Sequence, residues 1–100
     1  MRSDPSLLVL SSLAGGEKHG YAMVADIEQM AGVHLGAGTL YGALSRLETQ
    51  GLIEPVAPAG RRRPYRITGA GSEALQSQLT ALARVADTGL TRLRASGVRA

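Results

Sequence analysis

GAGTLYGALSRLETQGLIEPVAPAGRRRPYRIT, residues 36–68, is the stretch that decides the predicted fold of this 100-residue chain. In its first half, apolar side chains recur three and four positions apart, which is the spacing of one buried helix face. These inward-facing residues are Leu40, Ala43, Leu44 and Leu47. Gly51 follows where a left-handed helix cap is expected. The segment therefore predicts an amphipathic helix that ends before Gly51.

The outer face of this helix has an unusual composition. It carries small or polar side chains and a single arginine: Thr39, Gly42, Ser45, Arg46 and Thr49. A face this thin fits the major groove of DNA. An ordinary surface helix, which is the alternative, usually carries more Glu and Lys. The pattern favours a recognition helix, in which Arg46 bonds a guanine or a phosphate.

The second half of the stretch predicts a β-hairpin. Residues 52–56 and 64–68 are short β-type segments, and the loop of residues 57–63 between them contains turn residues and three arginines. Pro55 and Pro64 indicate a two-stranded edge ribbon, because proline cannot donate to a central ladder. Arginines at the tip of such a ribbon can neutralise phosphates or enter the minor groove. Arg61, Arg62 and Arg63 are therefore predicted to contact DNA, with a merely solvated loop as the alternative.

Two further helices are expected before this stretch. Asp4-Pro5 has the pattern of an N-cap followed by proline at the first helical position. The first helix should be buried through Leu7, Leu8, Leu10, Leu13 and Ala14 and should end at Gly15-Gly16. The second helix should bury Met23, Val24, Ile27 and Met30 and should stop at Gly32. Residues 33–35 are long enough only for a bridge of strand.

A fourth helix is expected from a cap at Thr68 to about Ser96. Its apolar positions approximate a heptad seam: Leu75, Leu79, Leu82, Ala86, Leu90 and Leu93. Gly89 interrupts this pattern, and a bend or fraying there is an open alternative. A helix of about 27 residues spans about 40 Å, longer than a core of this size can cover. We therefore expect part of the seam to pair with a second copy, although folding back onto the first helix is the alternative for the rest.

The predicted order is helix, helix, helix, hairpin, long helix, which is a mainly α, winged helix-turn-helix fold with three helices and a two-stranded wing. Residues 1–68 are assigned to the winged domain. Residues 69–100 are assigned to a C-terminal dimerisation helix and a short tail. Association of two copies also suits a chain of this length, whose own core is small.

Composition narrows the classes of function. Lys and Arg outnumber Asp and Glu by 11 to 8, and residues 35–68 hold the densest basic cluster. The chain has no cysteine, which excludes disulfides and thiol chemistry. His19 and His34 have no acidic residues spaced to complete a metal site, and Glu17, Asp26 and Glu28 fit a solvated face. We therefore expect neither an enzyme nor a metal or cofactor site.

The apolar run near the N-terminus is short. Leu7 to Leu10 falls well below the roughly 20 apolar residues that a membrane span needs. No basic segment or cleavage pattern of a signal peptide accompanies it. The expected location is the cytoplasm.

Several motifs stand in a recognisable order. They are Lys18-His19-Gly20-Tyr21, Gly38-Thr39-Leu40-Tyr41, Leu44-Ser45-Arg46-Leu47-Glu48, Gly51-Leu52-Ile53, the run from Arg61 to Thr68, and Ala70-Gly71. With this ordered set the chain resembles PadR-like transcriptional regulators, and the single helix after the wing resembles their compact subgroup. The chain departs from the family pattern at Gly36-Ala37, Gly42 and Pro64, where members commonly carry Ser-Pro, proline and an aromatic residue. The resemblance implies a dimeric repressor, often responsive to a small organic or phenolic effector.

The expected site residues follow from the residues and the resemblance together. The predicted DNA contacts are Thr39, Tyr41, Gly42, Ser45, Arg46, Arg61, Arg62 and Arg63. Tyr21 and Tyr65 are expected to pack, Tyr65 at the base of the wing. Contact with a phosphate is the less favoured alternative for Tyr21 and for His19, and packing of its ring on the wing is the alternative for Tyr41. A two-fold homodimer predicts double-stranded DNA with pseudo-palindromic half-sites as the partner. An effector would line either the dimer seam or the region of Leu10, Leu13, Met23 and Met30, although core packing is favoured for those four residues. The alternative function is a protein-interaction module whose basic wing docks on an acidic partner.

Overall fold

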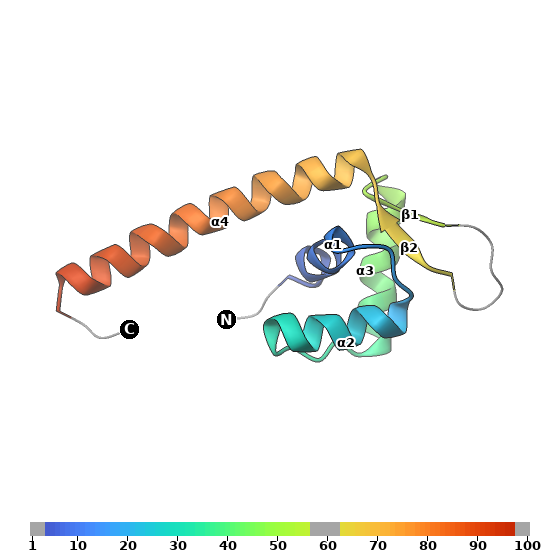
Figure 1. Cartoon of the computed structure of the whole chain (residues 1–100), viewed down its shortest axis with the longest axis horizontal. Helices are drawn as coiled ribbons and strands as arrows, with labels where there is room; N and C mark the ends of the chain where they lie inside the picture. Colours follow the sequence, from blue (N-terminus) through green and yellow to red (C-terminus); the bar gives the residue numbers. More distant parts are fainter. Residues whose placement is uncertain (1–3, 57–62, 98–100) are drawn as a thin grey trace.

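The structure is a computed structural model that describes residues 4–56 and 63–97. Four helices and a two-stranded sheet follow one another along the chain (Figure 1). Their bounds are α1 Pro5–Ala14, α2 Gly20–Ala31, α3 Ala37–Thr49, β1 Ile53–Pro55, β2 Tyr65–Ile67 and α4 Gly69–Ala95. This arrangement confirms the predicted winged helix-turn-helix fold.

Local chemistry explains where the helices begin and end. The Asp4 side chain accepts a hydrogen bond of 3.0 Å from the backbone N–H of Ser6, and Pro5 occupies the first position of α1. Gly32 ends α2 in the left-handed conformation, with φ of 68°, and Gly51 has φ of 76° just after α3. Only glycine adopts such angles without a steric cost. The three predicted helix boundaries are therefore confirmed.

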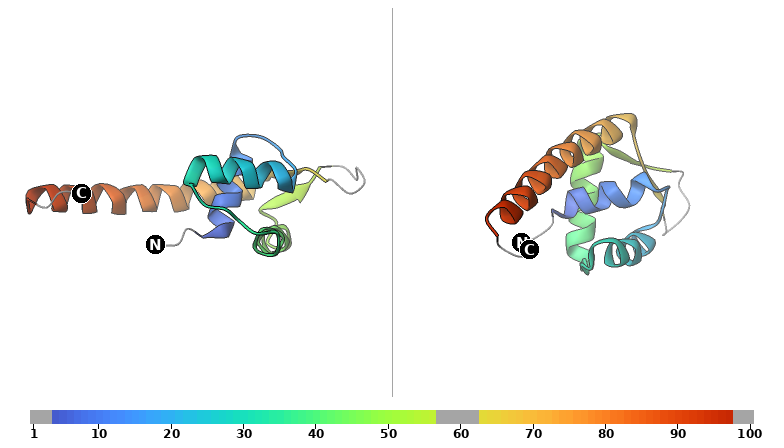
Figure 2. Two further views of the ribbon diagram at one scale, coloured as in Figure 1. Left: turned by 90° about the horizontal axis from the view of Figure 1, so that it is seen from below. Right: turned by 60° about the vertical axis from the view of Figure 1, so that its left-hand side comes forward.

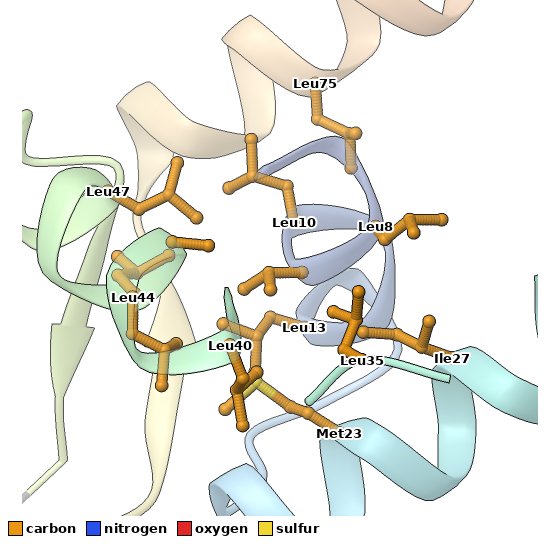
Figure 3. Packing of buried hydrophobic residues seen from close by; sticks show 13 residues of the cluster. Leu8, Leu10, Leu13, Met23, Ile27, Leu35, Leu40, Leu44, Leu47 and Leu75 are labelled. Atoms are coloured by element: carbon orange, nitrogen blue, oxygen red, sulfur yellow. The ribbon is translucent and has the colours of Figure 1, made fainter. Parts of the chain in front are cut away.

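The core is centred on α1, which packs against α2, α3, α4 and β2. Leucines of α1 and α3 meet Met23 and Ile27 of α2 in its middle (Figure 3). The predicted inner face of α3 is buried throughout, and Val9 of α1 is fully buried as well. Met30 and Ala14 were wrongly expected to be buried. Both are exposed, because each lies in the last turn of its helix.

The wing is a three-part assembly. β1 and β2 pair antiparallel with Ile53 opposite Ile67, and the linker between α1 and α2 adds an isolated bridge between Lys18 and Tyr65. The backbone N–H of Tyr65 donates to the Lys18 carbonyl at 2.9 Å, and that of Lys18 donates to the Tyr65 carbonyl at 3.2 Å. Residues 33–35, which are long enough only for a bridge, form neither a strand nor a bridge. The strand-like contact lies one linker earlier, where the chain passes beside β2.

The start of α4 is fastened to the base of the wing. Thr68 caps α4, its hydroxyl accepting from the Gly71 N–H at 3.0 Å and donating to the Gly51 carbonyl at 2.7 Å. Gly71 lies so close to β1 and β2 that an added Cβ would stand 2.0 Å from the Leu52 carbonyl oxygen and 2.8 Å from Cγ1 of Ile67. This approach requires glycine at position 71.

Beyond its first turns, α4 extends away from the rest of the molecule, and its C-terminal end lies at the end opposite the wing (Figures 1 and 2). The Cα radius of gyration is 15.7 Å, against about 13 Å for a compact domain of 100 residues. The helix runs without interruption through Gly89. Leu75 was expected in the dimer seam, but its side chain is buried in the core of its own chain beside α1 (Figure 3). We therefore remove it from the seam.

Candidate nucleic-acid interface

The outer face of α3 is open to solvent. Thr39, Ser45, Arg46 and Thr49 are exposed, and Gly42 is half-buried. An added Cβ at Gly42 would stand 3.6 Å from a terminal guanidinium nitrogen of Arg46. The Arg46 side chain therefore lies back over Gly42, toward the N-terminal half of α3, as long helical side chains usually do. The glycine leaves room for the guanidinium.

A hollow of about 600 Å³ joins three elements of the molecule. The start of α2 contributes His19, Gly20, Tyr21 and Ala22, α3 contributes Tyr41, and the wing contributes Arg63 and Tyr65. In Figure 1, the start of α2 and the wing lie at the same end of the molecule. The N-terminal half of α3 and the base of the wing thus border the same hollow.

Gly20 permits this close approach of α2 to α3. An added Cβ there would stand 3.1 Å from the Tyr41 hydroxyl oxygen and 3.2 Å from Cδ2 of Leu40. Tyr41 itself is 57% exposed, so its ring covers Gly20 while much of its surface faces solvent. The N-cap residue His19 makes no side-chain capping bond. Both side chains are therefore available to a ligand in the hollow.

Two tyrosines differ from each other in their surroundings. Tyr21 was expected to pack, and this was wrong: the side chain is 87% exposed. The helical period could have shown this, since Tyr21 stands two positions before the buried Met23 and hence about 160° around the helix. Tyr65 is half-buried against the core, as expected. His19 and Tyr21, for which phosphate contact was only the less favoured alternative, thus become candidate contact residues.

The arginines of α3 and the wing differ in whether they form an ion pair. Arg66 pairs with Glu54 on the opposite strand at 3.1 Å, and the two residues face each other in the hairpin register. Such an exposed pair stabilises the fold by at most about 1 kcal/mol. Among the described residues, neither Arg46 nor Arg63 forms an ion pair. Arg61 and Arg62 lie outside the described residues.

The exposed face of α4 carries a row of apolar side chains. Leu79, Leu82, Leu90 and Leu93 of the predicted seam are exposed, as are Ala86 and the neighbouring Val85. Val85 is 69% and Leu82 46% exposed. Exposed apolar side chains gathered on one surface mark a contact with another molecule.

The region of Leu10, Leu13 and Met23, which was one possible lining for an effector site, is part of the packed core. Leu10, Leu13 and Met23 are fully buried in the core, which leaves packing as their role. A different hollow of about 440 Å³ lies between α2 and α3. Its lining includes Val24, Leu35, Leu40 and the rings of Tyr21 and Tyr41.

The family assignment rests on the sequence as well as on this geometry. The model of the transcriptional regulator PadR-like family matches residues 9–77. The chain belongs to this family. PadR-like proteins are transcriptional regulators and not enzymes, which agrees with the sequence-based expectation. A transcriptional regulator of Mycobacterium tuberculosis is 35% identical over 88 residues, covering 85% of this chain and 81% of its own length.

This PadR-like chain is also similar to a longer transposon protein and to two solved structures. An uncharacterised 37.1 kDa protein of transposon TN4556 from Streptomyces fradiae is 48% identical over 83 residues. The match covers 83% of this chain but only 24% of the transposon protein, so the chain spans about a quarter of that relative. A PadR family regulator from Clostridium difficile has the same fold, with a TM-score of 0.76 and 23% identity over 91% of this chain and 99% of its own. A transcriptional regulator from Clostridium thermocellum gives a TM-score of 0.76 at 25% identity, over 92% and 96% of the two chains.

In residues 4–56 and 63–97, no helix is both long enough and apolar enough to span a membrane.

Proposed function

We propose that the protein is a cytoplasmic, homodimeric repressor that binds a pseudo-palindromic operator in double-stranded DNA. In this proposal α3 enters the major groove and the wing contacts the adjacent backbone or minor groove. The contact residues are Thr39, Tyr41, Gly42, Ser45, Arg46, Arg61, Arg62 and Arg63, to which the structure leads us to add His19 and Tyr21. Repression follows when the bound dimer occludes a promoter.

One observation carries the proposal. Tyr41 of α3 and Arg63 of the wing line the same hollow, which supports a common binding surface formed by α3 and the wing. A DNA duplex needs such a common surface, because the groove and its flanking phosphates lie within one face of the double helix. The excess of arginine in this part of the chain supports the same partner, since arginine forms forked bonds with phosphate and guanine.

The second part of the proposal concerns the long helix. We assign residues 1–68 to the DNA-binding domain and residues 69–100 to dimerisation, with the qualification that Gly71 and Leu75 complete the core of the first part. Leu79, Leu82, Ala86, Leu90 and Leu93 would pair across the two-fold axis. That symmetry places the two α3 helices about one DNA turn apart, which is why an inverted repeat is expected.

The proposal extends to a small organic effector, which the resemblance to PadR-like regulators implies. The hollow between α2 and α3, at about 440 Å³, has a volume within the range of about 300–1,000 Å³ that small-molecule sites occupy. Tyr21 and Tyr41 line it, so a ligand there would compete directly with DNA. A ligand at the dimer seam would instead change the spacing of the two α3 helices. Measuring ligand effects on operators with two different half-site spacings separates these two modes.

The general test is selection of bound duplexes from a random pool, followed by titration at several salt concentrations. An enriched inverted repeat is the expected result. If the dimer contacts roughly 8 phosphates, log affinity should fall with log salt at a slope of about −7. Absence of duplex binding at low salt would overturn the proposal and favour an acidic protein partner for the basic wing.

Arg46→Ala is expected to weaken binding to the selected operator by about 1–3 kcal/mol and to relax base preference at one position in each half-site. The reason is that its guanidinium lies over the thin face of α3, where a base edge would be. The measurement is operator affinity compared with affinity for a scrambled duplex. Arg84→Ala is a matched control, because Arg84 is an exposed arginine on α4. Equal losses on both duplexes would instead make Arg46 a phosphate contact.

A further inference from the structure

Lys18 is the single lysine of the chain, and its side chain is mostly buried against the end of α1. Its ammonium donates to the Ser12 carbonyl at 2.5 Å and to the Gly16 carbonyl at 3.2 Å. Only 19% of the side chain is exposed. These carbonyls lie at and just beyond the C-terminal end of α1, where the helix dipole favours a cation.

The same ammonium also faces α2. The Lys18 nitrogen lies 4.0 Å from a carboxylate oxygen of Asp26, and that oxygen accepts a bond of 2.7 Å from the Ser12 hydroxyl. Ser12 is buried and Asp26 is half-buried, so this is not the solvated acidic face that the sequence suggested for Asp26. The side chain of Lys18 therefore connects the end of α1 to the middle of α2.

The backbone of Lys18 makes a third connection. Its N–H and carbonyl form the two-bond bridge with Tyr65 at the start of β2. The next residue along the chain, His19, occupies the N-cap position of α2, and Tyr65 borders the same hollow as Tyr41. Through Lys18, the wing is thus joined to α1 and to α2, and the start of α2 carries His19 and Tyr21 of the candidate interface.

We propose that Lys18 is a positioning residue for DNA binding: its side chain fixes the linker to α1 and α2, and its backbone then holds the wing at the angle that duplex DNA requires. The inference rests on the proposed DNA-binding function. It assigns Lys18 no contact with the DNA, because its ammonium is engaged inside the protein.

The test compares Lys18→Met, which keeps the aliphatic stem and removes the charge and donors, with Lys18→Arg, which keeps both. Amide hydrogen exchange reports the bridge, because the Tyr65 N–H is bonded to the Lys18 carbonyl. The Val56 N–H, bonded within the hairpin to the Pro64 carbonyl at 2.9 Å, is an internal control. In Lys18→Met we expect Tyr65 exchange to accelerate about tenfold while Val56 changes less than about twofold.

DNA affinity is the second measurement on the same variants. Lys18→Met should bind the selected operator about tenfold more weakly, with a shallower salt slope because wing phosphate contacts are lost. Lys18→Arg should stay within about threefold of the wild type. If Lys18→Met does not fold, Asp26→Asn, which retains an acceptor for Ser12, should shift both measurements in the same direction.

Two results would overturn the inference. Unchanged Tyr65 exchange in Lys18→Met would show that the side chain does not hold the bridge, and with a reduced salt slope it would make Lys18 a direct phosphate contact. Faster exchange with unchanged DNA affinity would show that the wing angle does not matter. Failure of the wild type to bind any duplex would instead reject the proposed function, while the exchange experiment would still report on Lys18.

Discussion

Leu82→Asp is expected to convert the protein from dimers to monomers and to lower its affinity for a two-half-site operator by at least about 100-fold. Leu82 is 46% exposed on a helix that extends away from its own core. Burying one leucine stabilises a contact by about 1.5–3 kcal/mol. In a two-fold dimer the substitution occurs in both protomers, so this stabilisation is lost twice and two carboxylates are placed in an apolar contact.

DNA affinity is lost because the two DNA-binding domains are no longer held together. When two modules are held together at a matching distance, the second binds with an effective concentration that raises overall affinity by about 10²–10⁴. A monomer retains the α3 and wing contacts of one half-site only. Its salt slope should therefore fall by about half, while its base preference within one half-site is unchanged.

Thr80→Asp provides the matched control for this substitution. Thr80 is exposed and stands two positions before Leu82, about 160° around the helix, so the same charge is placed on the opposite side of α4. Sedimentation at micromolar concentration measures the oligomeric state of both variants. If Leu82→Asp remained a dimer that binds the operator normally, the proposed seam on α4 would be wrong.

The elements that sequence predicted well are those whose cause is local. Asp4 and Pro5 define the start of α1 within one turn, and Gly32 ends α2 through its own φ angle. The buried face of α3 follows from a period that needs no knowledge of its neighbours. The outer face of α3 is predictable for the same reason, because it consists of the positions that the buried face leaves over.

The predictions failed where positions with the same sequence pattern differ in their tertiary contacts. Leu75 and Leu79 continue one seam, yet Leu75 is buried in the core beside α1, whereas Leu79 is exposed. The heptad pattern does not distinguish these environments. The bridge between Lys18 and Tyr65 joins single residues that are far apart in sequence, and a single pairing leaves no periodic signal.

The candidate interface shows the same division. The exposed position of Arg46 could be predicted from the helical period of α3 alone, whereas Tyr41 was included because of the resemblance to PadR-like regulators. The hollow that brings Tyr41 together with Arg63 and His19 depends on the relative placement of α2, α3 and the wing. Gly20 helps to form this hollow, since a side chain at position 20 would meet Tyr41. The amino-acid sequence around Gly20 gives no indication that Tyr41 is its neighbour.

Gly71→Ala is expected to destabilise the folded protein by about 3 kcal/mol, the upper part of the usual range for overpacking. An added Cβ would stand 2.0 Å from the Leu52 carbonyl oxygen, and that oxygen also accepts the Thr68 N–H at 3.0 Å. Backbone held by such bonds cannot move aside as a flexible side chain can. The start of α4 would have to separate from the wing, which would also weaken the packing of Leu75.

Thermal unfolding followed by circular dichroism, at one fixed protein concentration, measures this loss. For a domain of this size about 3 kcal/mol corresponds to a decrease in Tm of more than about 10 °C. Gly69→Ala is the control, because an added Cβ there meets nothing within 4 Å. That variant should keep its Tm or gain slightly, since replacing glycine by alanine at a compatible site stabilises by about 0.4–1 kcal/mol. Equal melting temperatures for the two variants would mean that α4 can move away from β1 at little cost, and the fixed junction between wing and long helix would have to be abandoned.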